Sequence, residues 1–129
     1  MKLSKLLSVL GVQCSQEAEI TALTCDSREV IPRALFAALP GSRADGRAHI
    51  PEALYRGAAA VVCAPPLPAG VPGAPVDDPR TALALLAAEF YGRPADGLSL
   101  IAVTGTKGKT TTAHMIRDIL SAAGYKPGM

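Results

Sequence analysis

The chain has 129 residues, of which 49% are hydrophobic and 19% charged, and its formal net charge is +2. This composition excludes an intrinsically disordered chain, and the length predicts a single domain with a core large enough to fold alone. The small net charge gives no support for binding to nucleic acid or to an anionic membrane. No run of about eighteen apolar residues predicts a membrane span.

The first segment, residues 3–10, predicts a short amphipathic helix. Its four leucines fall at helical spacing, and Gly11 suits the position just after a helix end. The segment also resembles a lipoprotein signal, because two lysines and a leucine stretch precede Cys14. However, the apolar stretch is very short, and Gln13 stands where a small residue should precede the cleavage site. We therefore interpret it as a helix of the folded domain.

Three short segments rich in apolar and β-branched residues predict strands: residues 20–25, 34–39 and 58–63. A polar corner, Asp26-Ser27-Arg28, follows the first of them. Taken alone, Asp26 and Arg28 predict a structural ion pair or a turn cap. Ser27 is equally consistent with a turn-forming serine and with a serine that binds a ligand.

Two helices are predicted around the last of these strands. Residues 50–56 predict a short helix before it. Asp78 and Pro79 begin the second helix, because Asp caps free N–H groups and Pro fits the first helical position, and Gly92 ends it. The segment between the strand and the second helix, residues 65–75, is dense in Pro and Gly and predicts a loop.

The cysteines and histidines give no sign of a metal or disulfide framework. Cys14, Cys25 and Cys63 are odd in number and include no C-x-x-C pair. We expect buried free thiols in a reducing cytosol. His49 and His114 are isolated, and for His114 a solvated position on a helix is expected rather than a catalytic role.

The most informative segment is TGTKGKT, residues 104–110. It lies between a predicted strand, residues 98–103, and a helical pattern, residues 113–123. A strand, a glycine loop, Lys-Thr and a helix in this order are the layout of a phosphate-binding loop. Val103 stands where the general motif has its first glycine, so the loop is a shortened and more restrictive variant.

The residue types of this loop suit an anionic ligand. The two glycines allow a tight turn that presents backbone N–H groups, and the helix directs its positive dipole end at the same anion. Lys109 would add a positive charge for the terminal phosphates, and Thr110 would place a hydroxyl where Mg²⁺ binds. The predicted nucleotide-binding residues are Thr104, Gly105, Thr106, Lys107, Gly108, Lys109 and Thr110.

The alternation of strands and helices predicts an α/β fold with a mainly parallel sheet. Residues 93–97 form a loop and the best domain boundary, which separates residues 1–96 from residues 97–129. The second part supplies only one strand and one helix, below the size that usually folds without support. We therefore expect this chain to be a fragment of a longer protein.

Two separated stretches resemble the Mur ligase family, most closely its MurE type. The first comprises residues 25–41, with the sequence CDSREVIPRALFAALPG, together with DG at residues 45–46 and ALYRGA at residues 53–58. The second is the loop TGTxGKT. A Lys at position 107, where Asn is commoner in the family, is a mild departure. The likeness covers nearly all of the chain.

The resemblance implies a fold, an activity and a place in the cell. Residues 1–96 would be a Rossmann-like domain that binds UDP-MurNAc. Residues 97–129 would be the first strand, P-loop and helix of a truncated central ATP-binding domain. The implied enzyme is an ATP-dependent ligase of cytoplasmic peptidoglycan synthesis and a monomer. It phosphorylates the carboxylate of UDP-MurNAc-L-Ala-D-Glu, and the amine of a diamino acid, meso-diaminopimelate or L-lysine, attacks the acyl phosphate.

The resemblance also implies roles for individual residues. Lys109 would act in catalysis on the ATP phosphates. Contacts to the UDP substrate would come from Cys25 through its backbone, from Ser27, and from Ser42, Arg43 and Ala44. Because the family's modified lysine, metal-binding acid and amino-acid-binding domain follow later in its sequence, we expect no turnover from this chain alone.

Two other functions remain open at this point. The chain could be a stand-alone uridine-nucleotide-binding domain that carries a trailing strand and helix. It could also belong to another P-loop ligase, similar to folylpolyglutamate synthase, although the block around Asp26-Ser27-Arg28 and Leu35-Phe36 argues against that.

Overall fold

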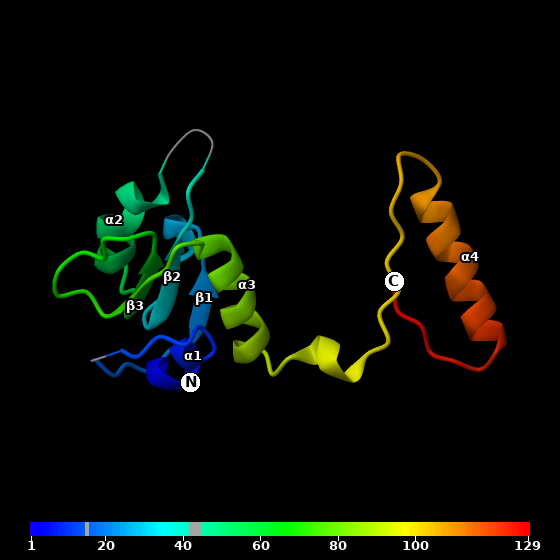
Figure 1. Cartoon of the computed structure of the whole chain (residues 1–129), viewed down its shortest axis with the longest axis horizontal. Coiled ribbons are helices and arrows are strands. Elements are labelled where there is room, and N and C mark those ends of the chain that lie inside the picture. The colour runs from blue at the N-terminus through cyan, green and yellow to red at the C-terminus, as the bar shows by residue number, and fades with distance from the viewer. Residues whose placement is uncertain (15, 42–44) are drawn as a thin grey trace. The chain divides into compact units, whose positions relative to one another are not determined.

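The structure is a computed structural model, and it describes residues 1–14, 16–41 and 45–129. The chain divides into two compact units, Met1–Pro94 and Ala95–Met129 (Figure 1). The first unit holds a sheet covered by helices, and the second holds a single long helix with the segments on either side of it.

A four-stranded parallel sheet forms the centre of the first unit, which confirms the predicted α/β class. Neighbouring strands follow one another in sequence, so the order is β1-β2-β3-β4. The register places Leu35 beside Ala60 and Val62 beside Ala74. Because every strand is parallel, all four carboxyl ends meet at one edge of the sheet. The strands are β1 (Ala22–Thr24), β2 (Ala34–Ala38), β3 (Ala60–Cys63) and β4 (Gly73–Pro75).

The helices lie where the sequence predicts them, with ends that differ by a few residues. The α-helices are α1 (Leu3–Ser8), α2 (Ile50–Tyr55), α3 (Pro79–Phe90) and, in the second unit, α4 (Lys109–Ala122). Short 3-10 helices are η1 (Ser27–Glu29), η2 (Gly46–His49) and η3 (Pro94–Gly97).

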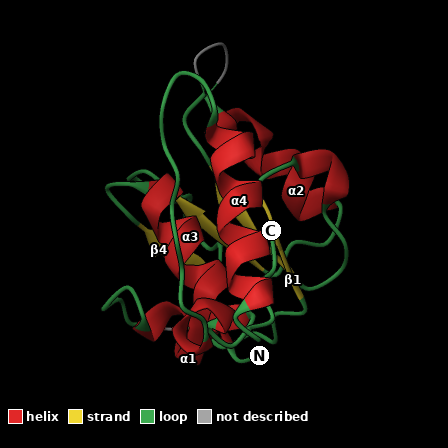
Figure 2. Ribbon diagram, turned by 90° about the vertical axis from the view of Figure 1, so that its right-hand side faces the viewer, coloured by secondary structure: helices red, strands yellow, loops and turns green. Residues whose placement is uncertain are grey.

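The core has two layers, one on each face of the sheet. In β2, Leu35 points to the layer that holds the α1 leucines and Leu86 of α3, and the next residue, Phe36, points to the opposite layer with Ile50 of α2. This alternation follows from the two-residue period of a strand. Figure 1 shows α2 and α3 on opposite sides of the strands, and Figure 2 shows α3 across the near side of the yellow strands.

The start of α3 confirms the predicted cap. Asp78 accepts hydrogen bonds from the N–H groups of Arg80 and Thr81 at 3.0 and 3.2 Å, and from the Thr81 hydroxyl at 2.6 Å. These bonds, that of the Thr81 hydroxyl above all, lower the pKa of the Asp78 carboxyl. Pro79 occupies the first turn, where its missing N–H costs nothing.

The predicted loop over residues 65–75 is wrong at its C-terminal end, where β4 forms. Pro75 is tolerated there because β4 is an edge strand of the sheet. Gly73 permits the pairing, since its φ is +141° and a Cβ at this position would lie 1.8 Å from the Val61 carbonyl oxygen. Only one glycine of this segment, Gly73, serves a close approach between two strands, and the composition of the segment alone does not distinguish it from Gly70.

The predicted strand over residues 98–103 does not form, although α4 follows it as expected. Leu98, Leu100 and Ile101 are 64%, 73% and 61% exposed. A strand needs a neighbour to pair with its backbone groups, and the described residues of the second unit include no strand. Among those described residues, α4 likewise buries none of its side chains.

The expectation of buried thiols holds only for Cys63. Cys25 is exposed and Cys14 is half-buried, and all three cysteines are free. Burial in β3 raises the pKa of the Cys63 thiol. Within the part of the chain that the structure describes, we find no helix with both the length and the apolar character that crossing a membrane requires.

The contact at Gly73 generates a stability prediction. Gly73→Ala should lower the free energy of unfolding by at least about 1–3 kcal/mol, because the new methyl group overlaps the Val61 backbone. Gly70→Ala is the matched control in the same connection: its φ is +78°, but no atom lies within 4 Å of a Cβ there. It should cost about 1 kcal/mol. Urea unfolding followed by circular dichroism measures both, and equal losses would contradict the proposed overlap.

The two units should also differ in backbone protection. In the 129-residue chain, amide hydrogens of residues 98–103 should exchange much faster than those of Ala60–Cys63, because only the latter belong to a paired strand. Hydrogen exchange followed by mass spectrometry gives the comparison. Protection of equal strength in the two segments would show that residues 98–103 are structured independently of any further strand.

Candidate functional site

The corner after β1 is organised by an ion pair. Asp26 accepts from the Arg28 N–H at 2.9 Å, which caps η1, and its Oδ2 lies 2.6 Å from Nη2 of Arg28. The side-chain hydrogen bonds from Arg28 lower the pKa of the Asp26 carboxyl to about 2. The sequence prediction of an ion pair or turn cap is confirmed, and both are present. Both contacts lie within the corner itself, between residues two positions apart.

Ser27 lies inside this corner and is 6% exposed. Its hydroxyl donates a hydrogen bond of 2.6 Å to Oε2 of Glu52, in the first turn of α2. The other oxygen of Glu52 accepts from Nε of Arg56 at 3.1 Å. The bond from Ser27 is the largest cause that lowers the pKa of the Glu52 carboxyl, and Arg56 lowers it further.

Glu52 is a residue of this corner that sequence reasoning missed. It is separated from Ser27 by 25 positions, and no short motif connects the two. The one signal available was a charged side chain in the first turn of a short helix whose Ile50 and Ala53 are buried.

Of the other predicted substrate contacts, the structure describes Cys25. Cys25 is exposed and directly follows β1. Ser42, Arg43 and Ala44 follow β2, the next strand of the sheet, and lie outside the described residues. Open α/β sheets bind ligands at the carboxyl ends of their strands, and these positions fit that rule.

The loops at this edge are tied to one another. Asp45 accepts from the Arg47 N–H at 3.0 Å and caps η2. The Arg47 guanidinium donates to the carbonyl oxygens of Pro65 and Pro66 at 3.2 and 2.9 Å. These bonds join the loop after β2 to the loop after β3.

The second unit contains the predicted phosphate-binding loop. Gly108 has a φ of +76° and immediately precedes α4, which begins at Lys109. The first hydrogen bond back to the loop is that of the Thr112 N–H with the Gly108 carbonyl, at 2.9 Å. The N–H groups at the start of α4, residues 109–111, are therefore free to donate to an external acceptor. None of the described side chains caps them.

Lys109 and His114 both contact the backbone of this loop and helix. The Lys109 ammonium donates to the Gly105 carbonyl at 2.6 Å, which places its charge beside the loop. His114 Nδ1 lies 2.8 Å from the Thr110 carbonyl oxygen, which can only accept, so this nitrogen carries the proton. His114 is half-buried rather than fully solvated. Thr106, Lys107 and Thr110 are exposed.

The donor set around Thr110 fits Mg²⁺ only together with phosphate. Within the described part of the chain, no group of three or more His, Cys, Asp or Glu side chains could hold a metal ion. Mg²⁺ commonly takes one or two protein ligands and completes its shell with phosphate oxygens and water. A single hydroxyl beside free helix N–H groups is consistent with that arrangement.

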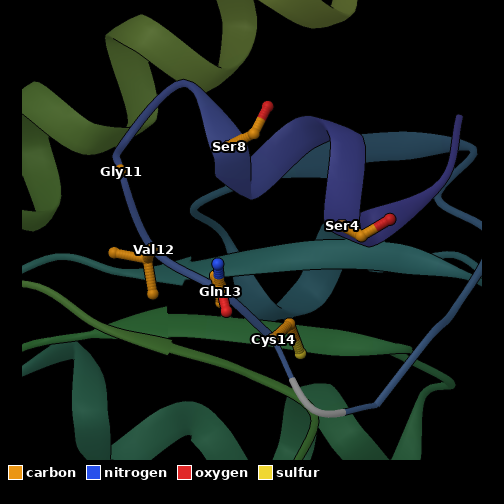
Figure 3. Close-up of a pocket in the computed structure, with 6 residues that line it drawn as sticks. All are labelled: Ser4, Ser8, Gly11, Val12, Gln13 and Cys14. Carbon is orange, nitrogen blue, oxygen red and sulfur yellow. The ribbon is translucent and has the colours of Figure 1, made fainter.

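Two surface hollows lie in the first unit, away from these positions. One has a volume of about 410 Å³ and is formed by α1 and the segment after it, with Ser4 and Ser8 on the helix and Gln13 and Cys14 on the segment (Figure 3). The other, of about 570 Å³, lies between the end of α1 and the start of α3. Neither is lined by a predicted ligand-binding residue, so we assign no role to them.

Comparison with protein families matches both parts of the chain. Residues 19–91 match the model described as Mur ligase family, catalytic domain. Residues 103–128, which include the predicted phosphate-binding loop, match the Mur ligase middle domain. The first match alone covers more than half of the chain.

Curated relatives carry the name UDP-N-acetylmuramoyl-L-alanyl-D-glutamate–2,6-diaminopimelate ligase. The protein from Geobacillus thermodenitrificans is 46% identical over 132 residues, which cover 100% of this chain and 27% of that protein. The protein from Chlorobium phaeobacteroides is 50% identical over 113 residues, which cover 84% of this chain and 22% of that protein. The chain thus spans about a quarter of the length of the relatives it matches.

Solved structures give the same result. A UDP-N-acetylmuramoyl-L-alanyl-D-glutamate–2,6-diaminopimelate ligase superimposes with a TM-score of 0.73 at 25% identity, over 96% of this chain and 26% of that one. The MurF ligase from Thermotoga maritima, in complex with ADP, gives a TM-score of 0.62 at 32% identity, over 78% and 23%. The parallel sheet, the phosphate-binding loop and both family models therefore agree that this chain belongs to the Mur ligase family.

Proposed function

We propose that this chain carries the UDP-substrate site and the ATP loop of an amide-forming ligase of peptidoglycan synthesis. The ligase would add 2,6-diaminopimelate to UDP-MurNAc-L-Ala-D-Glu. The observation that carries the proposal is the uncapped start of α4, where Lys109 of TGTKGKT and free N–H groups lie together within a matched Mur ligase middle domain. The names of the curated relatives support diaminopimelate over L-lysine as the amino acid added.

Each of the two parts of the chain would bind a different substrate. We assign the UDP-MurNAc-dipeptide to residues 1–96, at the carboxyl edge of the sheet near Cys25, Ser27 and residues 42–44. We assign ATP to the loop that begins the second part, residues 97–129. The separate family matches, on either side of residues 92–102, support this division.

The chemistry explains why a cationic loop is needed. A carboxylate is a poor electrophile, so ATP would supply the phosphoryl group that activates it as an acyl phosphate, and Mg²⁺ would offset the repulsion between the anionic partners. The N–H groups at the start of α4 would donate hydrogen bonds to the β- and γ-phosphates. Lys109 would move from the Gly105 carbonyl to a phosphate oxygen, and Lys107 would add charge beside it. Thr110 would hold the metal through its hydroxyl.

The remaining parts of the proposal follow from the resemblance. The partners are the UDP-MurNAc-dipeptide, ATP and a diamino acid, and the reaction takes place in the cytoplasm with the enzyme as a monomer. Residues that this chain lacks would complete the site, since the relatives are about four times longer.

Loss of the loop charge is the direct test. In a full-length ligase that contains this sequence, Lys109→Ala should weaken ATP binding by about 10- to 150-fold, which corresponds to about 1.5–3 kcal/mol for a charged hydrogen bond, and should abolish ligation. Lys126→Ala, which removes an exposed lysine after α4, is the control and should change neither quantity. Calorimetry and an assay of phosphate release measure the two effects. Normal ATP affinity with normal turnover in Lys109→Ala would refute the assignment.

The substrate corner should respond separately from the ATP loop. In the same ligase, Ser27→Ala should raise the KM for the UDP substrate about tenfold, as expected for one lost hydrogen bond, and should leave the KM for ATP unchanged. Ser8→Ala is the control, since the Ser8 hydroxyl bonds only within its own helix, to the Lys5 carbonyl. Steady-state kinetics with each substrate varied in turn gives the answer. A change confined to ATP would remove Ser27 from the UDP-substrate site.

A further inference from the structure

The hydrogen bond between Ser27 and Glu52 fixes the direction of the Ser27 hydroxyl. A serine hydroxyl has one proton to donate and two lone pairs that accept. In this corner the proton is donated to Oε2 of Glu52 at 2.6 Å, a length typical of a hydrogen bond to a charged acceptor. The hydroxyl of Ser27 therefore has no proton left for another partner.

Glu52 is well suited to keep that proton in place. Its other oxygen accepts from Nε of Arg56 at 3.1 Å, and His49 Nδ1 lies 3.9 Å from Oε2. The bond from Ser27 and the neighbouring Arg56 lower the pKa of this carboxyl, so it is ionised at neutral pH and only accepts hydrogen bonds. The Glu52 carboxylate therefore carries no proton that it could donate to the Ser27 oxygen.

The lone pairs of Ser27 are unused by the described residues. Among the residues that the structure describes, no group donates a hydrogen bond to the Ser27 oxygen. The residue is only 6% exposed, so bulk water reaches little of it. An acceptor of fixed direction at the carboxyl edge of the sheet thus calls for a hydrogen-bond donor on the ligand.

The nucleobase is the part of a UDP substrate whose hydrogen-bond donors and acceptors have fixed positions, so its binding can depend on such an acceptor. The pairing edge of uracil has a single donor, the N3–H, between two carbonyl oxygens. Cytosine has an unprotonated N3 at the same place, which only accepts. A ribose hydroxyl can rotate to donate or accept, so it gains nothing from an acceptor of fixed direction.

We propose that Glu52 is a positioning residue that holds the Ser27 hydroxyl as an acceptor and thereby selects uracil over cytosine through the uracil N3–H. The inference rests on the proposed function, because it takes the UDP substrate to bind in this corner. Arg56 supports the selection by keeping Glu52 in place, and neither residue touches the ligand.

The test compares UDP with CDP as ligands of the 129-residue chain. Isothermal titration calorimetry should show a preference for UDP. In Glu52→Gln the preference should fall by about tenfold, because the amide can donate to Ser27 as well as accept, which frees the serine proton for cytosine N3. A purely structural role of Glu52 would weaken both ligands equally and leave their ratio unchanged.

Two further variants keep the result interpretable. In Ser27→Ala the preference should also fall, and adding Glu52→Gln to it should cause no further change, since the two act through one hydroxyl. Glu29→Gln removes a carboxylate from the same turn, η1, and should leave the preference intact. Thermal melting of each variant identifies any loss of folding. If Glu52→Gln does not fold, the ratio of UDP to CDP affinity in Ser27→Ala decides, and an unchanged ratio overturns the proposal.

The outcomes separate this inference from the function on which it rests. If the unaltered chain does not bind UDP, both the proposed substrate site and the role of Glu52 are overturned. UDP binding with no preference over CDP, or with a preference that Glu52→Gln leaves unchanged, would overturn the role of Glu52 and leave the substrate site standing. Sensitivity to 2′-deoxy-UDP without any base preference would place the Ser27 contact at the ribose, and would also overturn the role of Glu52.

Discussion

Pairing of backbone groups between parallel strands is the constraint on which the rest of this structure depends. β2 and β3 have a neighbour on each side, and every residue of both strands is buried. β4 has an unpromising composition but forms, because the Val61 N–H and the Cys63 carbonyl bond to residues on either side of it. Residues 98–103 are rich in strand formers and stay unpaired, since a strand exists only beside another.

The same sheet positions the chemistry of the first unit. Because all strands are parallel, the corner after β1 and the loops after β2 and β3 share one edge. The bond from Ser27 to Glu52 connects that corner to the start of α2, and Arg47 connects the two loops. The corner after β1, the described part of the proposed substrate site, is therefore held to the start of α2.

Features set by neighbouring residues could be predicted from the sequence. The cap at Asp78, the ion pair between Asp26 and Arg28, and the presence of a helix after the TGTKGKT loop all depend on residues within a few positions. Features set by distant residues could not. The contact of Ser27 with Glu52 spans 25 positions, and β4 depends on the space beside Val61, which no local pattern of Pro and Gly encodes.

The hydrogen bond from Lys109 to the Gly105 carbonyl has a consequence for the entropy of ligand binding. A free lysine side chain loses up to about 2 kcal/mol of rotamer freedom when it is fixed by a ligand. Here the 2.6 Å bond restricts the side chain beforehand, so part of that loss already belongs to the ligand-free loop. In the proposed ATP complex Lys109 leaves the Gly105 carbonyl for a phosphate oxygen, so binding would exchange a neutral acceptor for a charged one, and the broken bond would offset part of the entropy that is saved.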